Sequence, residues 1–240
     1  MIPLYDDNPA RLAPVVTIGI IAACVLVFLW QLSLGDQGEA AMFSLGFIPD
    51  LLFSNASTSP GPIPVSKYLT IFTSMFMHGD VLHIAGNMLY LWIFGNNIEG
   101  AMGHVKFVIF YLLCGVAAAL TQAYMSPDSQ IPMIGASGAI AGILGAYLIL
   151  YPRAHVYTVI ALGVYFQQVR LPAIVVLGGF LLLQFVNAAL TDPGEPGVAW
   201  WAHIGGFVAG IALLPLFKAR DVPFFAGQTD GVPRRRGPWG

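Results

Sequence analysis

Long apolar segments recur along almost the whole chain and restrict it to very few folds. The longest lie at residues 15–34, 105–123 and 172–190, and about 20 apolar residues are enough for a helix to cross a bilayer. Of the 240 residues, 57% are hydrophobic and 9% are charged, whereas soluble domains carry roughly 25% charged residues. Because lipid cannot satisfy an exposed backbone, these helix-length segments predict a polytopic helical membrane protein.

We expect an all-α fold in which one membrane domain, residues 15–217, contains six spans. The spans are predicted at residues 15–34, 82–98, 105–123, 137–151, 172–190 and 201–217. Residues 1–14 are expected to form a cytoplasmic segment. Residues 218–240 include three consecutive arginines and are expected to form a disordered basic tail that contacts anionic headgroups. The first apolar segment is long enough to span, which argues against a cleaved signal peptide.

Two further apolar segments are too short to cross a bilayer. Residues 43–53 belong to a long connection after the first span, and we predict that they rest on the membrane interface. Residues 155–166 are flanked by Arg153 and Arg170, and cations at both ends favour two ends on the same side. This second segment is interpreted as interfacial or re-entrant, and both alternatives stay open.

The basic residues set the predicted orientation. In the six-span arrangement every Lys and Arg except Lys67 lies on one side, which is the cytoplasmic side by the positive-inside rule. Both termini are therefore expected in the cytoplasm, and the lack of a transit peptide favours a prokaryotic plasma (inner) membrane. Cys24 and Cys114 fall inside apolar stretches, so we expect packing residues and no disulfide.

Three polar residues begin spans that run in the same direction. The second, fourth and sixth spans run inward, and their outer ends carry His83, Ser137 and His203. Each residue lies 15 or 16 positions before a charged residue at the inner end of its span, a helical length of about 22–24 Å. The hydrocarbon core is about 30 Å thick, so we expect the three side chains at a common depth below the outer surface.

Small residues predict that the fourth and sixth spans pack closely. Five glycines are expected at the contact: Gly135, Gly138, Gly142, Gly206 and Gly210. Their small-xxx-small spacing lets two helix backbones approach each other. His203 shares a helical face with the two glycines of its own span, so this packing would direct the imidazole toward the fourth span. Ordinary packing of small residues is the alternative for the glycines taken alone.

A serine and a histidine at this depth could form a catalytic pair. Serine is a weak nucleophile until a base takes its proton, and His203 is the candidate base for Ser137. No carboxylate is expected at this depth on a neighbouring span, so the sequence predicts a dyad. His83 and Asn87 lie one helical turn apart. Their side chains and the backbone N–H of Ser137 could donate hydrogen bonds to an oxyanion.

Each of these residues also has a structural interpretation. A lone serine among small residues is often a packing residue, and a histidine or asparagine in a span can link helices. A metal site of His78, His83 and His203 would lack a His-Glu-x-x-His motif and a carboxylate, so we expect no metal and no cofactor. His78, nearer the loop, is expected to be a surface or interface residue. No nucleotide motif is present, and nothing argues for nucleic-acid binding.

Together these residues resemble the rhomboid family of intramembrane serine proteases. The matching motifs, in family order, are His-Gly at 78–79, His-x-x-x-Asn-Met at 83–88, Gly-Ala-Ser-Gly at 135–138 and Ala-His-x-x-Gly-x-x-x-Gly at 202–210. The resemblance covers about residues 73–217. It implies a six-helix core with Ser137 as nucleophile and His203 as base. It also implies an oxyanion hole of His83, Asn87 and the Ser137 backbone N–H.

The resemblance implies cleavage of transmembrane segments of membrane proteins through an acyl-enzyme. Substrates would enter from the lipid bilayer between the second and fifth spans, and residues 191–198 would form a gate or cap together with the fifth span. Two departures stand out. The first long loop lacks the Trp-Arg pair of many family members, and Ala141 stands where some members carry an aromatic residue that stacks on the catalytic histidine. A non-catalytic relative that escorts membrane clients is the main alternative, and a small transporter is another. The oligomeric state is not predicted.

Overall fold

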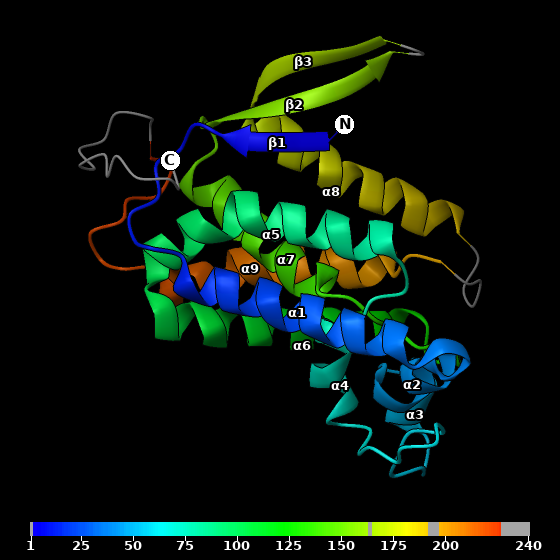
Figure 1. The fold of residues 1–240 in the computed structure, drawn as a ribbon. Coiled ribbons are helices and arrows are strands. Elements are labelled where there is room, and N and C mark those ends of the chain that lie inside the picture. Colours follow the sequence, from blue (N-terminus) through cyan, green and yellow to red (C-terminus); the bar gives the residue numbers. More distant parts are fainter. Residues whose placement is uncertain (1, 163–164, 192–196, 227–240) are drawn as a thin grey trace.

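Helices make up most of the computed structural model, which describes residues 2–162, 165–191 and 197–226 (Figure 1). The helices are α1 (Val15–Ser33), α2 (Gly38–Leu45), α3 (Pro49–Phe53), α4 (Thr70–Thr73), α5 (Val81–Met102), α6 (His104–Met125), α7 (Ser137–Leu150), α8 (Ala173–Leu190) and α9 (Trp200–Phe217), with 3-10 turns η1 (Gly35–Gln37) and η2 (Ser74–Phe76). The strands are β1 (Ile2–Asp6), β2 (His155–Leu162) and β3 (Tyr165–Pro172). The six predicted spans correspond to α1, α5, α6, α7, α8 and α9, with ends that differ by at most four residues.

Among the described residues, four helices are long and apolar enough to cross a membrane. They are α1, α6, α8 and α9. Helix α7 is apolar but has only 14 residues, which gives about 21 Å of helix. Helix α5 has 22 residues but includes the buried polar side chains Asn87, Asn97 and Glu99. The described residues thus contain four candidate membrane spans, and six crossings remain a prediction.

Helix α7 lies at the centre of the bundle and contacts α5, α6, α8 and α9 (Figure 1). Its contact with α9 depends on glycines, which have no side chain to separate the two helices. A Cβ atom on Gly206 would lie 2.0 Å from the carbonyl oxygen of Gly138, and one on Gly210 would lie 2.0 Å from that of Gly142. Real Cβ atoms do not approach carbonyl oxygens so closely, so the two backbones can touch only through glycine.

A three-stranded antiparallel sheet, in the order β1-β2-β3, corrects the all-helical prediction. Strand β2 and the first residues of β3 take up the described part of the segment interpreted as interfacial or re-entrant, residues 155–162 and 165–166. The run from Val156 to Ile160 is rich in β-branched and aromatic residues, which favour strands. The partner strand comes from the N-terminal segment, where the ring of Tyr5 stacks on that of Tyr157 at 4.4 Å. Strand β1 contacts α5, whereas β2 and β3 contact α8.

The long connection between α1 and α5 folds into short helices beside one end of the bundle (Figure 1). It includes residues 43–53, which were predicted to rest on the membrane interface. Here Phe47 is buried, and its backbone forms an isolated bridge with Met133, through hydrogen bonds of 3.0 and 2.7 Å. This pairing ties the connection to the segment that leads into α7.

The start of α1 is held by a side chain from another helix. Glu99 of α5 is fully buried, and its carboxylate accepts hydrogen bonds from the backbone N–H groups of Val16 at 2.9 Å and Thr17 at 2.8 Å. The Thr17 hydroxyl donates to the same carboxylate at 2.7 Å, and His104 Nδ1 lies 2.6 Å from its other oxygen. A carboxylate at a helix N-terminus satisfies otherwise unpaired N–H groups.

Residues 218–226 continue from α9 across the ends of other helices. The backbone N–H of Ala219 donates to the carbonyl of Ala101 at 2.8 Å, and that of Phe225 donates to the carbonyl of Ile149 at 3.0 Å. Asp221 forms an ion pair of 2.8 Å with Arg11. The arginine-rich end of the predicted tail, residues 227–240, lies outside the described residues.

Candidate active site

Ser137 and His203 are in direct contact at two adjoining helix starts. Ser137 is the first residue of α7, and His203 lies in the first turn of α9. The Oγ atom of Ser137 is 2.8 Å from Nε2 of His203. The imidazole is only 9% exposed, so most of its surroundings are protein. This separation is within the range of an O–H to N hydrogen bond, which permits direct proton transfer.

The other ring nitrogen of His203 contacts a residue that the sequence reasoning missed. Nδ1 is 2.7 Å from Oε1 of Gln184, a buried residue of α8. Aromatic rings flank the imidazole: the centroid of Phe180 lies 6.2 Å away and that of Trp200 lies 6.3 Å away. The expected pair therefore has a third polar neighbour, an amide instead of a carboxylate. The available signal was a lone glutamine in an apolar helix, because an amide at membrane depth needs a partner.

His83 and Asn87 approach the backbone just before Ser137. A Cβ atom on Gly135 would lie 2.6 Å from His83 Nε2 and 3.5 Å from Asn87 Nδ2. Gly135 has a φ of +118°, which L side chains rarely adopt, and its N–H donates to the carbonyl of Ser74 at 2.9 Å. The residue must therefore be glycine both for its backbone conformation and for the space that the two side chains occupy.

Asn87 presents a free hydrogen-bond donor to this region. Its Nδ2 atom is buried and has no hydrogen-bond partner among the described residues. A buried donor without an acceptor costs roughly 1–3 kcal/mol. Such a group is available to an acceptor that is not part of the protein. His83 is fixed nearby, since its backbone N–H donates to the Asp80 carboxylate at 2.9 Å at the start of α5.

One cavity of about 750 Å³ joins all four candidate residues. Ser137, His203, His83 and Asn87 line it, together with Tyr90 of α5 and Phe180 of α8. The rings of Tyr90 and Phe180 have centroids 6.2 Å apart. One side of the cavity is thus lined by α5 and by Phe180 of α8, the helices that correspond to the second and fifth predicted spans.

Comparison with known proteins identifies the family. Residues 65–220 match the family model described as the Rhomboid domain. The chain belongs to the rhomboid family. The resemblance seen in the sequence motifs is therefore confirmed, and the matched range includes every candidate residue of the cavity.

This rhomboid chain is similar to curated members of the family. Proteins named rhomboid protease GlpG from Salmonella choleraesuis, Salmonella newport and Salmonella heidelberg are each 28% identical to it over 213 residues. The similarity covers 88% of this chain and 66% of each relative. The chain thus spans slightly less than two thirds of the length of these relatives.

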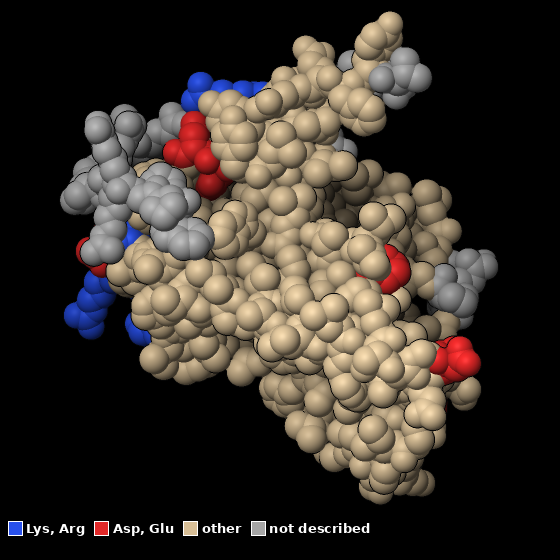
Figure 2. All heavy atoms as spheres, in the orientation of Figure 1, with Lys and Arg blue, Asp and Glu red and all other residues tan. Residues whose placement is uncertain are grey.

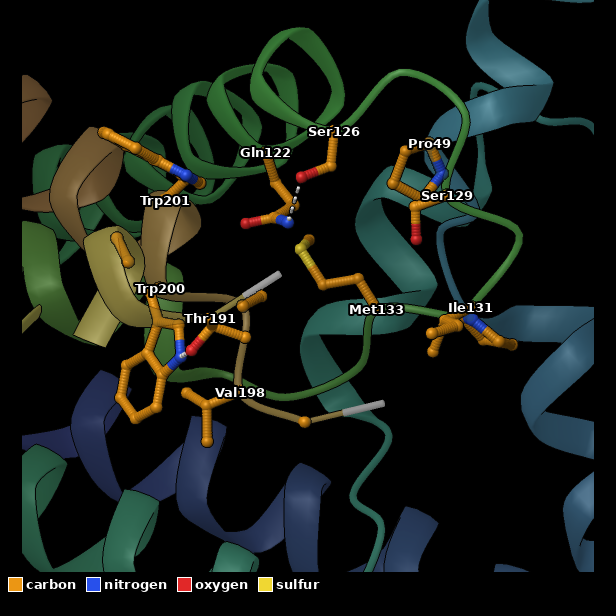
Figure 3. A pocket seen from close by; sticks show the side chains of 14 residues that line it. Pro49, Gln122, Ser126, Ser129, Ile131, Met133, Thr191, Val198, Trp200 and Trp201 are labelled. Atoms are coloured by element: carbon orange, nitrogen blue, oxygen red, sulfur yellow. Dashed lines mark hydrogen bonds between the residues drawn. The ribbon is translucent and has the colours of Figure 1, made fainter. Parts of the chain in front are cut away.

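A smaller cavity of about 100 Å³ adjoins the first at the start of α9 (Figure 3). Gln122 of α6 lines it, and its Oε1 accepts a hydrogen bond of 3.2 Å from the backbone N–H of Ala202. Trp200 donates from its indole nitrogen to the Thr191 hydroxyl at 3.1 Å. These contacts hold the helix start that carries His203. Residues 192–196, in the middle of the predicted gate or cap, lie outside the described residues.

The other histidines of this rhomboid do not join the pair. His78 is 1% exposed, so of the two positions expected for it, at the surface or at an interface, the surface is wrong. Its backbone exchanges hydrogen bonds of 3.0 and 3.1 Å with the amide of Gln31, and its ring centroid lies 5.1 Å from that of His83. Burial, reinforced by His83, lowers the pKa of His78 to about 4, so it is neutral near pH 7. His104 and His155 lie at the opposite end of the bundle, near Glu99 and Asp7 respectively.

Proposed function

We propose that this rhomboid is an intramembrane serine endopeptidase that cleaves transmembrane segments of membrane proteins. The observation that carries the proposal is the 2.8 Å contact between Ser137 Oγ and His203 Nε2, two residues that line one cavity of the helical bundle. A packing serine needs no imidazole partner, whereas a nucleophile does. The names of the Salmonella relatives support the same activity.

In the proposed reaction His203 Nε2 takes the proton of Ser137 as Oγ attacks the scissile carbonyl carbon. The electron pair of the carbonyl moves onto its oxygen to form a tetrahedral oxyanion. The intermediate collapses by breaking the carbon–nitrogen bond, and the leaving amine takes the proton from His203. An ester on Ser137 remains. Water then attacks this ester while His203 again acts as base, which releases the acid and restores the hydroxyl.

The oxyanion would bind to three donors. They are the backbone N–H of Ser137 and the side chains of His83 and Asn87. The unpartnered Nδ2 atom of Asn87 supports this role, as does the position of both side chains over Gly135. Donors that are fixed before the reaction stabilise the developing charge without reorganisation.

The substrate would enter laterally from the bilayer between α5 and α8. Tyr90 and Phe180 line the cavity on this side, and a rearrangement of their rings would widen the passage. In the proposed topology both termini are cytoplasmic in a prokaryotic plasma membrane with six crossings. The Lys and Arg visible in Figure 2 gather at the end of the bundle where α1 begins, which supports this orientation.

Labelling with a fluorophosphonate probe tests the proposal. The detergent-solubilised protein should form a covalent adduct and should cleave a single-span membrane protein. Ser137→Ala and His203→Ala should lose both properties while they keep the fold. A folded wild type that neither reacts nor cleaves would instead favour the non-catalytic alternative, a protein that binds or escorts membrane clients. A His203→Ala variant with wild-type activity would remove the base assignment.

A further inference from the structure

We infer that Gln184 is a positioning residue that holds His203 in the tautomer needed for proton transfer. This inference rests on the proposed function and adds a third residue to the pair of Ser137 and His203. The residue acts through the histidine, because its amide contacts the ring nitrogen that faces away from the serine. It is supplied by α8, a helix separate from those that carry the pair.

The hydrogen bonds around Gln184 define which of its atoms faces the imidazole. Nε2 of Gln184 donates to the backbone carbonyl of Phe180, one helical turn earlier, at 3.3 Å. This contact requires a donor, so the amide nitrogen occupies that position and the carbonyl oxygen Oε1 faces His203. The separation between Oε1 and Nδ1 is 2.7 Å, a short hydrogen bond for these atoms.

The orientation of the amide fixes the protonation of the neutral ring. A carbonyl oxygen can only accept, so Nδ1 of His203 must carry the hydrogen. Nε2 is then unprotonated and faces Ser137 Oγ at 2.8 Å, ready to accept its proton. The opposite tautomer would place a lone pair of Nδ1 against Oε1 and a hydrogen against the serine. Gln184 thus disfavours the tautomer that cannot act as a base.

The hydrogen bond of Gln184 to His203, at 2.7 Å, is shorter than the one it donates to the Phe180 carbonyl, at 3.3 Å. Its side chain is 5% exposed, and its neighbours Leu183 and Phe185 are exposed apolar residues on the outer face of α8. An amide in such a helix is costly unless it is partnered. Ala141 offers no ring to stack on His203, so the amide provides an orientation that the alanine cannot.

Two variants test the positioning role. Gln184→Met keeps the approximate shape of the side chain but removes the acceptor. We expect kcat to fall about 10- to 100-fold, because the variant loses part of the rate enhancement that a general base contributes. KM should change little. Gln184→Glu restores an acceptor, so it should recover much of kcat. It should also move the acidic limb of the kcat profile to higher pH, because a carboxylate stabilises the protonated imidazole.

Asn97→Leu is the matched control, since it removes a buried amide that donates to the Asn8 carbonyl at 3.0 Å at the far end of α5. It should lower stability without changing kcat or its pH profile. The inference is overturned if Gln184→Met retains full kcat. It is also overturned if Asn97→Leu lowers kcat as much as Gln184→Met does and Gln184→Glu leaves the pH profile unchanged.

A spectroscopic measurement separates this inference from the proposed function. In protein with 15N-labelled histidine, the signals of His203, assigned by comparison with His203→Ala, should show a hydrogen on Nδ1 and none on Nε2. Gln184→Met should mix the two tautomers. A wild type with the hydrogen on Nε2 overturns the inference, even if Gln184→Met fails to fold. If the wild type shows the expected tautomer but neither cleaves nor reacts with fluorophosphonate, the proposed function fails and the hydrogen bond stands.

Discussion

At the scale of single residues, the polar atoms in the cavity differ in whether they already have partners. Both ring nitrogens of His203 and both amide atoms of Gln184 form hydrogen bonds within the protein. Asn87 differs, because its Nδ2 atom is buried and unpartnered among the described residues. Because this donor lines the cavity, it is available to an acceptor that arrives during the reaction.

Asn87→Ala should therefore slow the chemical step without weakening substrate binding. We expect kcat to fall roughly 10²- to 10³-fold, as when one oxyanion donor is removed from other hydrolases, with KM nearly unchanged. Steady-state cleavage of a transmembrane substrate in detergent measures both parameters. Asn97→Leu, on the same helix but far from the cavity, should keep kcat near the wild-type value. Full activity of Asn87→Ala would exclude the amide from the oxyanion hole.

At the scale of helices and strands, local rules explain what the sequence could predict. Helix ends and the glycine faces of α7 and α9 follow from hydropathy and from spacing within each helix. The sheet does not, because β1 and β2 pair residues about 150 positions apart: Ile2 lies opposite Val159. The contact between Gln184 and His203 could not be predicted for the same reason, since the two residues belong to different helices.

Gly210→Ala tests the contact between α7 and α9 away from the reactive residues. The new Cβ atom would meet the Gly142 carbonyl oxygen at 2.0 Å, so the backbones must separate. Overpacking of a tight core costs about 1–3 kcal/mol, and we expect at least this loss in the free energy of unfolding, measured in mixed micelles. Gly19→Ala in α1 is the control, because its Cβ would meet nothing within 4 Å. Equal stability of the two variants would contradict the close packing of these helices.

At the scale of the whole molecule, the ion pairs of the described residues lie at the end of the bundle opposite the cavity. Glu99 holds the start of α1, Arg11 pairs with Asp221, and the Tyr147 hydroxyl of α7 donates to the Asp6 carboxylate of β1. These contacts join the sheet, the bundle and the segment after α9. The helix that begins with Ser137 therefore ends in contact with the sheet, and the stability of this end should depend on the protonation of Asp6.

Burial, together with the neighbouring charge of Asp7, raises the pKa of Asp6 from 3.8 to about 7, although the hydrogen bond from Tyr147 opposes the shift. The folded state therefore favours the protonated carboxyl. This contribution to stability is complete below about pH 4 and is lost as the pH rises through about 7. We expect the free energy of unfolding to fall by on the order of 2 kcal/mol across this window. This is less than the full pKa shift would give, because Asp6 is only partly buried and solvent screens its charge.

Asp6→Asn should remove most of this pH dependence, because an amide does not titrate. Tyr147→Phe removes the hydrogen bond that lowers the pKa of Asp6, so the pKa of Asp6 should rise further. The fall in stability of this variant should then extend to higher pH than that of the wild type. Denaturant unfolding of the three proteins in micelles between pH 4 and pH 8 compares these curves. Parallel curves for the wild type and Asp6→Asn would show that Asp6 has the same pKa in the folded and unfolded protein. The contact between the sheet and α7 would then be independent of the charge of Asp6.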